Sequence, residues 1–277
     1  MKDGDYVVKV NHPIFSNNDF KNDYYKYFLY GNLCERKFYD IETDNSNYAI
    51  FIFYNQDNET LIPSGDVWFW TKKDISKEKL EESMSLLPAE GNIIYKSEIN
   101  DFMSDSNGIN INEFVEINGC YKCINPQKPK RTVDCKIEKV SIEDKEELID
   151  LWIQNGKEWE YDFSRDDVEK WIINWINDNN FYVYKKDNKI ICFATYQIID
   201  NYARVEHAYT RKEYRGNGYM ANLIYDMTSI ILNNNLIPVL QTDINYESSN
   251  KSYQNIGYKL EDVLVKTNFK KRFTKSL

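Results

Sequence analysis

The feature that most constrains the fold of this chain is a regular succession of strand and helix patterns after residue 132. Short apolar-rich runs, typical of strands, are separated by stretches with apolar residues every third or fourth position, typical of helices. In order they predict a strand, two helices, three strands, a helix, a strand, a helix and a strand. Because a strand that returns after a helix implies a mixed sheet, this half predicts an α+β fold.

Local signals mark where these elements begin and end. Ser141 stands three residues before Asp144, close to a capping box, and Ser164 opens a second amphipathic helix. The turn-like run KDNK joins FYVYKK to KIICFATYQII, which indicates an antiparallel hairpin, and YARVEHAYT predicts the next strand. The remaining predicted elements are the strand LIPVLQTDI, the short helix SSNKSYQNIG and the extended segment YKLEDVLVKTNF.

The chain is long enough for two globular units, since 42% of its 277 residues are apolar. The run NPQKPKR places two prolines and three basic residues between apolar-patterned segments, which predicts an exposed linker. We therefore expect a first domain over residues 1–125, a linker over 126–132 and a second domain over 133–277.

The first 125 residues predict a smaller α+β domain. YAIFIFY, DVWFW and NIIYKSE are strand-like, and SKEKLEESMSLLPAE is helix-like, but no glycine-rich turn accompanies them. Their order is that of a degenerate copy of the second half, although no repeat is visible in the residues themselves. A role in acceptor recognition or in dimerisation is left open.

Charge and cysteine content exclude several kinds of partner. A net charge of -9 opposes binding to phosphate backbones or anionic lipid, so neither nucleic acid nor a membrane is expected. MKDGDYVVKVNHPIF has no apolar core of signal-peptide length, which predicts a cytoplasmic location. Scattered cysteines in odd number predict reduced thiols, and the CYKC run lacks a second ligand pair, so no metal site is expected. The cysteines are Cys34, Cys120, Cys123, Cys135 and Cys192.

The run Arg215-Gly216-Asn217-Gly218 places two of the ten glycines after a strand and before the helical stretch YMANLIYDM. Amides at a helix N-terminus are unpaired donors at the positive end of the helix dipole, which suits a pyrophosphate. Glycine lets an anion approach the main chain closely. The alternative is that the two glycines only form a turn. The spacing fits neither the P-loop nor the Rossmann fingerprint.

The stretch YTRKEYRGNGYMANLIYDM resembles the acyl-CoA binding motif of the GNAT N-acetyltransferase superfamily. Downstream, DINYESSNKSYQNIGYK is similar to the closing motif of that family, in which an Asn precedes a helix carrying a Tyr four residues before Gly-Phe/Tyr. The matching positions are Asn250, Tyr253, Gly257 and Tyr258. The resemblance covers roughly Val133 to Phe269 and implies the GNAT acyl-CoA N-acyltransferase fold for that half.

The resemblance implies an acetyl-CoA site made largely of backbone groups. The amides that would hold the pyrophosphate are those of Arg215, Gly216, Asn217, Gly218, Tyr219 and Met220. Main-chain groups of Ala208, Tyr209 and Thr210 would pair with the pantetheine arm, and one amide would polarise the thioester carbonyl. Asn250 is assigned to the same CoA-binding set. Met220 departs from the family pattern, which usually has Gly or Ala at that position.

Two catalytic roles follow from the resemblance. Tyr253 would donate a proton to the departing CoA thiolate, because a phenol of pKa near ~10 stays protonated at neutral pH. Glu206 lies where several family members carry a base and would deprotonate the amine; its alternative role is an ion pair with Arg204. His207 is the second candidate, but neighbouring strand residues point to opposite faces, so at most one of the two is expected to face the reacting atoms.

The expected function is acetyl transfer from acetyl-CoA to an amine of a small molecule or peptide, by direct attack in a ternary complex. The run NGKEWEYDFS over residues 155–164 interleaves acidic and aromatic residues. It is expected either to receive a cationic amine or to form an exposed acidic loop with its aromatic residues packed inward. The alternative function is a non-catalytic CoA-binding or sensing protein. A homodimer is left open.

Overall fold

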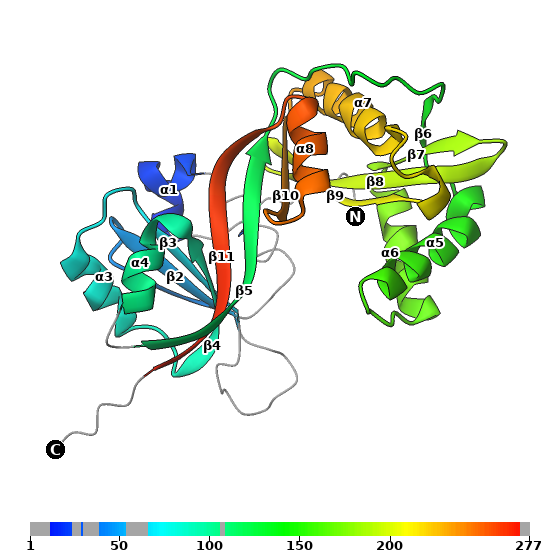
Figure 1. Ribbon diagram of the computed structural model, residues 1–277. Coiled ribbons are helices and arrows are strands. Elements are labelled where there is room, and N and C mark those ends of the chain that lie inside the picture. Colours follow the sequence, from blue (N-terminus) through cyan, green and yellow to red (C-terminus); the bar gives the residue numbers. More distant parts are fainter. Residues whose placement is uncertain (1–11, 24–28, 30–38, 54–65, 106–108, 272–277) are drawn as a thin grey trace. The chain divides into compact units, whose positions relative to one another are not determined.

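The computed structural model describes residues 12–23, 29, 39–53, 66–105 and 109–271, and the chain divides into two compact units (Figure 1). Unit 1 contains residues 121–241 and 247–259, and unit 2 contains the described parts of 7–120, 242–246 and 260–277. The predictions that concern residues 1–11 and Cys34 lie outside the described residues.

Unit 1 follows the predicted order of elements. Its strands are β6 (Ile137–Lys139), β7 (Phe181–Lys186), β8 (Lys189–Ile199), β9 (Tyr202–Thr210) and β10 (Ile237–Asp243), in the sheet order β10-β9-β8-β7-β6. Its helices are α5 (Lys145–Glu158), α6 (Arg165–Asn177), α7 (Tyr219–Asn233) and α8 (Glu247–Asn255). Neighbouring strands from β6 to β9 are antiparallel, and β10 is parallel to β9 after the α7 crossover. The predicted mixed sheet is confirmed.

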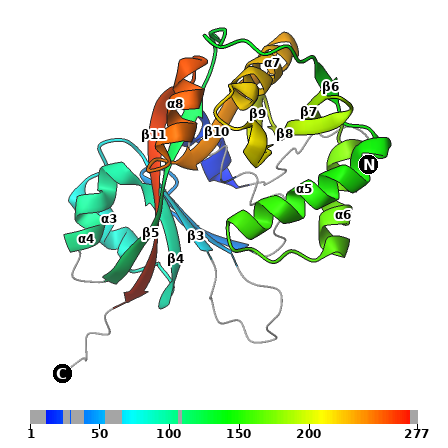
Figure 2. The same cartoon turned by 45° about the vertical axis from the view of Figure 1, so that its right-hand side comes forward.

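The helices of unit 1 begin where capping residues predict. The carboxylate of Asp144 accepts hydrogen bonds from the Ser141 N–H and hydroxyl, at 3.0 and 3.3 Å, and one 3-10 turn then leads into α5. The Ser164 hydroxyl accepts a hydrogen bond from the Asp167 N–H and begins α6. In Figures 1 and 2, α5 and α6 lie side by side.

Both faces of the unit 1 sheet are covered by helices. Phe181 and Val183 of β7 pack with α5 and α6, whereas Tyr182 and Tyr184, the alternate residues of the same strand, pack with α7. Because successive strand residues point to opposite faces, α7 covers the face opposite to α5 and α6. The first four residues of β7 are therefore all buried.

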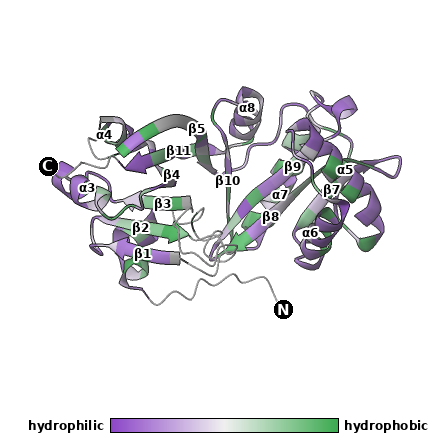
Figure 3. Ribbon diagram, turned by 90° about the horizontal axis from the view of Figure 1, so that it is seen from below, coloured by the Kyte–Doolittle hydropathy of each residue, from purple (hydrophilic) through white to green (hydrophobic). Residues whose placement is uncertain are grey.

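Unit 2 is a second α+β unit. Its strands are β1 (Tyr39–Thr43), β2 (Tyr48–Phe53), β3 (Asp66–Thr71), β4 (Glu90–Lys96), β5 (Ile109–Lys122) and β11 (Lys259–Lys271), in the sheet order β1-β2-β3-β4-β11-β5. Its helices include α1 (Asn18–Asn22), α3 (Lys77–Met84) and α4 (Asn100–Asp105). The hydrophobic residues of this unit fall mainly in strands such as β2 and β3 (Figure 3). The predicted strands and helix are confirmed.

The path of unit 2 repeats part of the path of unit 1. Strands β1, β2 and β3 are antiparallel, α3 follows, and β4 returns parallel to β3. Strands β7, β8 and β9 are likewise antiparallel, α7 follows, and β10 returns parallel to β9. The second copy that the sequence suggests is therefore visible in the topology of the strands.

The division of the chain differs from the predicted one in two places. β11 pairs with β4 in antiparallel register, from Leu264↔Lys96 to Lys270↔Glu90, so the last strand belongs to unit 2 rather than to the predicted domain 133–277. The predicted linker 126–132 is packed on unit 1. The Gln127 N–H donates to the Ile256 carbonyl at 2.9 Å, and a Cβ on Gly257 would lie 2.6 Å from the Asn125 carbonyl oxygen.

Within the described residues, no helix combines the length and the apolar character needed to cross a membrane. The four described cysteines, Cys120, Cys123, Cys135 and Cys192, are free thiols.

Candidate active site

The loop before α7 presents backbone amides to open space. Gly216 and Gly218 have φ angles of +72° and +86°, in the left-handed region that favours glycine. Gly218 is the N-cap of α7, and no side chain in the described part of the chain caps this helix. A Cβ built on Gly216 would meet no described heavy atom within 4 Å. The first amides of α7 are thus free to bind an anion, which fits the pyrophosphate of CoA.

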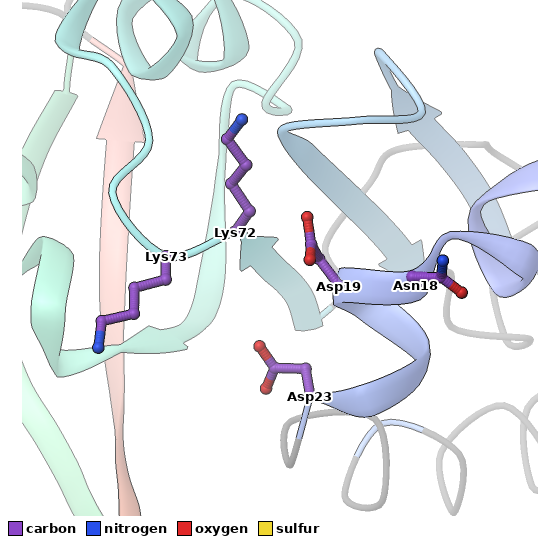
Figure 4. Close-up of a pocket in the computed structure, with 5 residues that line it drawn as sticks. All are labelled: Asn18, Asp19, Asp23, Lys72 and Lys73. Carbon is purple, nitrogen blue, oxygen red and sulfur yellow. The ribbon is translucent and has the colours of Figure 1, made fainter.

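The corresponding loop of unit 2, between β3 and α3, is built differently. The Ser76 hydroxyl caps α3 by accepting a hydrogen bond from the Lys79 N–H, so one of its first amides already has a partner. The pocket beside this loop has a volume of about 290 Å³, and Asp19 and Asp23 place two carboxylates in it (Figure 4). The other residues that line it are Asn18, Lys72 and Lys73. Two lysines balance the two carboxylates in this pocket, so the difference between the loops lies in the Ser76 cap, which has no equivalent among the described residues at Gly218 of α7.

The side chain of Arg215 ties the glycine loop to the end of α5. Its Nε donates to the Thr210 carbonyl at 2.9 Å, and Nη2 donates to Glu158 Oε2 at 2.7 Å. The guanidinium lies 5.3 Å from the centre of the Tyr209 ring, whose hydroxyl donates to Glu158 Oε1 at 3.0 Å. The Arg215 N–H donates to the Lys212 carbonyl at 3.2 Å, so the prediction that this amide holds the pyrophosphate is wrong, and Arg215 holds the loop in place instead.

In the run 155–164, the predicted exposed acidic loop with inward-packed aromatic residues is found only in part, and the predicted contact with a cationic amine stays a prediction. Its first four residues form the last turn of α5, and the Glu158 carboxylate is engaged with Arg215 and Tyr209 rather than exposed to a substrate. Trp159 and Tyr161 are exposed, at 57% and 61%. Phe163 packs inward against Gly156, where a Cβ would lie 2.6 Å from the Phe163 ring. Exposed aromatic side chains and a packed one thus occur together in this segment.

Replacing Glu158 with Gln is expected to lower the free energy of unfolding by about 1 kcal/mol at pH 7, because charge-assisted hydrogen bonds are lost. Burial alone would raise the Glu158 pKa, but hydrogen bonds from Arg215 and Tyr209 outweigh it and the pKa is lowered. The stabilisation is therefore complete above the ordinary pKa of 4.5 and is lost as the pH falls through the lowered value. Urea unfolding at several pH values measures this, with Glu160→Gln as the matched control. Equal losses in both variants would contradict the account.

The pairing of β9 with β10 stops before the predicted pantetheine-binding residues. It runs from Ile237↔Tyr202 to Leu240↔Val205, and no β10 partner is registered for the rest of β9 among the described residues. The opposite edge of β9 remains paired with β8, up to Cys192↔Thr210. Ala208, Tyr209 and Thr210 therefore lie on an edge that an extended ligand can pair with.

The prediction that Glu206 and His207 face opposite sides of the strand is wrong, because β9 contains a β-bulge at this point. Phe193 pairs with Tyr209 and Thr195 with Glu206, so one residue of β8 opposes two residues of β9. His207 has a φ of +54°, which is rare for a residue other than glycine. The extra residue interrupts the alternation, and Glu206 Oε1 lies 3.7 Å from His207 Nε2. No residue pattern in β9 indicates this bulge.

His207 packs against two tryptophan rings, whereas Glu206 is paired with Arg204. The His207 ring lies 5.0 Å from the ring of Trp152 and 4.7 Å from that of Trp175, centroid to centroid. The packed rings shield the His207 imidazole from part of the solvent, although 36% of its side chain stays exposed; this desolvation lowers its pKa against the opposing charge of Glu206, so the imidazole is neutral at neutral pH. Glu206 Oε2 accepts a hydrogen bond from Arg204 Nε at 3.0 Å, the ion pair that the sequence left as an alternative.

The two predicted residues of α8 lie in different environments. Burial raises the pKa of Tyr253 to about 12, and its hydroxyl makes no hydrogen bond to another described residue. Asn250 is buried, and its Oδ1 accepts a hydrogen bond from the Tyr121 hydroxyl at 2.5 Å. The Tyr253 hydroxyl is thus available to a ligand, whereas the Asn250 side chain has an internal partner that fixes α8.

The mixed sheet, the separating β9–β10 pair and the α7 helix that begins at Gly218 agree with the fold that the sequence resemblance implies for this half. Residues 147–258 match the model of the acetyltransferase (GNAT) family, and this part of the chain is a GNAT acetyltransferase domain. No curated protein matches the chain.

Three solved structures share the fold. A GNAT-family acetyltransferase from Colwellia psychrerythraea is 14% identical, with a TM-score of 0.58 over 80% of this chain and 85% of that one. A GCN5-related N-acetyltransferase from Sphaerobacter thermophilus is 11% identical, with a TM-score of 0.56 over 83% and 82%. A GCN5-related N-acetyltransferase from Kribbella flavida is 10% identical, with a TM-score of 0.53 over 88% and 93%. At these identities the likeness concerns the fold alone.

Proposed function

We propose that unit 1 transfers an acetyl group from acetyl-CoA to an amine of a small molecule or peptide, by direct attack in a ternary complex. The observation that carries this proposal is the uncapped glycine loop of α7 beside the open edge of β9. The family match over residues 147–258 supports the same chemistry.

The residues present suit the acyl donor. Amides from Gly216 to Met220 would hold its pyrophosphate, because the Arg215 N–H is engaged with Lys212, and the main chain of Ala208, Tyr209 and Thr210 would hold its pantetheine arm. When bound, acetyl-CoA supplies the thioester that the amine attacks. Met220 is compatible with this role, because its side chain is partly buried against the hydrophobic core of unit 1.

Tyr253 is proposed as the general acid. Its hydroxyl carries a proton throughout the neutral range because burial raises its pKa to about 12. With no described hydrogen-bond partner, it is free to donate that proton to the sulfur of the departing thiolate.

Glu206 and His207 are proposed to deprotonate the amine together. The Glu206 carboxylate accepts a hydrogen bond from Arg204 Nε at 3.0 Å, and its Oε1 lies 3.7 Å from His207 Nε2. His207 has a neutral imidazole able to accept the proton, and the nearby Glu206 carboxylate stabilises the imidazolium that results. We therefore assign the proton acceptor to His207 and its electrostatic support to Glu206.

Replacing His207 with Asn, a residue that tolerates the left-handed backbone at this position, is expected to lower kcat by about a hundredfold. In the wild type, kcat/KM should fall as the pH drops below 6.5 through the lowered His207 pKa, because the protonated imidazole accepts no proton. Steady-state rates between pH 5 and pH 9 measure both effects. Wild-type turnover in the His207 variant, together with its loss in Glu206→Gln, would return the role of base to Glu206.

A thiol-release assay with acetyl-CoA and a panel of polyamines, amino acids, aminoglycosides and peptides tests the function as a whole. We expect thiol release that depends on one class of amine and a product heavier by one acetyl group. If acetyl-CoA binds but no amine in the panel releases thiol, the non-catalytic CoA-binding function is favoured instead.

A further inference from the structure

A basic residue outside the glycine motif contacts the glycine loop. Arg131 Nη1 donates to the Gly216 carbonyl at 2.8 Å, and Nη2 donates to Asn217 Oδ1 at 3.0 Å. The Arg131 carbonyl accepts a hydrogen bond from Asn222 Nδ2 at 2.8 Å, and the same amide donates to the Gly218 carbonyl at 2.8 Å. Arg131 thus holds the loop directly at Gly216 and Asn217, and the Asn222 amide links its main chain to Gly218.

These contacts determine which way the amides of the loop point. A trans peptide unit is planar, so a Gly216 carbonyl directed at Arg131 turns the Asn217 N–H to the opposite side. A Cβ on Gly218 would lie 3.4 Å from the Arg131 carbonyl oxygen, which shows how closely the two segments pack. One side of the loop is therefore occupied by Arg131, and the amide of Asn217 is presented on the other.

The basic residues near the glycine loop also favour the binding of an anion there. Arg131 is exposed and follows Lys128 and Lys130 in the run KPKR, in a chain whose net charge is -9. A cation fixed against the loop raises the local potential where an anion would bind, although the chain as a whole is acidic.

We propose that Arg131 is a positioning residue of the pyrophosphate site, acting through the glycine loop rather than by direct contact with the ligand. The inference rests on the proposed function, since it concerns the loop assigned to acetyl-CoA. If Arg131 has this role, the segment 126–132, which the sequence predicted as a linker, is part of the acetyl-CoA site.

Calorimetric titration of the full chain with CoA and with 3′-dephospho-CoA tests this proposal. Arg131→Gln is expected to raise the Kd for both ligands by about tenfold, because both carry the pyrophosphate. Lys130→Gln, which removes the same charge one residue away, should change each Kd less than about twofold. Arg131→Lys keeps the charge but not the forked donor, so it should recover only part of the affinity that the Gln variant loses.

The outcomes separate the inference from the proposed function. If the wild type binds neither ligand, the proposed function fails. If the wild type binds and Arg131→Gln binds equally well, the function stands and the role of Arg131 is refuted. A loss confined to CoA would assign Arg131 to the 3′-phosphate, and full rescue by Lys would reduce its role to charge; either result overturns the positioning role. Melting temperatures without ligand should agree within about 2 °C, because Arg131 is a surface residue.

Discussion

The Gly218→Val variant is expected to lose the rise in melting temperature that acetyl-CoA produces in the wild type. Gly218 has a φ of +86°, and a β-branched residue in this region costs about 1–2 kcal/mol of backbone strain. Its Cβ would also lie 3.4 Å from the Arg131 carbonyl oxygen, so the loop must shift to accept it. With acetyl-CoA at about a hundred times its Kd, the wild-type rise should be on the order of 5 °C.

Gly218→Asn is the matched control for the glycine loop. Asn occupies left-handed backbone elsewhere in this chain, with φ of +59° at Asn188 and +58° at Asn235. The variant should therefore fold with less strain than the Val variant and keep part of the ligand-induced rise. Scanning fluorimetry with and without acetyl-CoA compares the three proteins. An unchanged rise in the Val variant would show that the anion does not bind at this loop.

Tyr253→Phe is expected to lower kcat by about a hundredfold while the Kd for acetyl-CoA stays within about twofold of the wild type. The substitution removes only the hydroxyl, which has no described hydrogen-bond partner, so the packing of α8 should be kept. Turnover is measured by thiol release with the amine identified in the panel, and affinity by calorimetry.

Tyr258→Phe is the control for this variant. The Tyr258 hydroxyl lies 2.9 Å from Thr228 Oγ1 in the buried core, so its loss should cost about 1 kcal/mol of stability and little turnover. If Tyr253→Phe turned over like the wild type, Tyr253 would have no role as the acid.

The fold of unit 1 was largely predictable from sequence because its signals are local. Apolar periodicity places α6 and α7, Ser164 marks a helix start, and KDNK marks the β7–β8 turn. The glycine loop was predictable for the same reason, since left-handed backbone at Gly216 and Gly218 is a property of residues close in sequence.

The features that escaped prediction depend on contacts between distant residues. The pairing of β11 with β4 joins segments far apart in the chain, and strand periodicity does not specify a partner. The bulge at His207 is set by the register against β8, and no residue type marks it. The fork of Arg131 on Gly216 spans 85 positions, so composition alone described its segment as a linker.

The pairing of β11 also decides whether the experiments can use a fragment or need the full chain. A fragment of residues 133–277 would carry β11 without its neighbours β4 and β5, leaving both edges of that strand unpaired. Every experiment proposed above therefore uses the full chain.

The most direct test of the account is the number of acetyl-CoA molecules that one chain binds. The uncapped glycine loop is found before α7, whereas Ser76 caps the corresponding helix of unit 2. Calorimetric titration should therefore give one site per chain, and Gly218→Val should remove it. Two sites per chain, no binding, or one site that survives Gly218→Val would contradict the assignment of the donor site to the α7 loop.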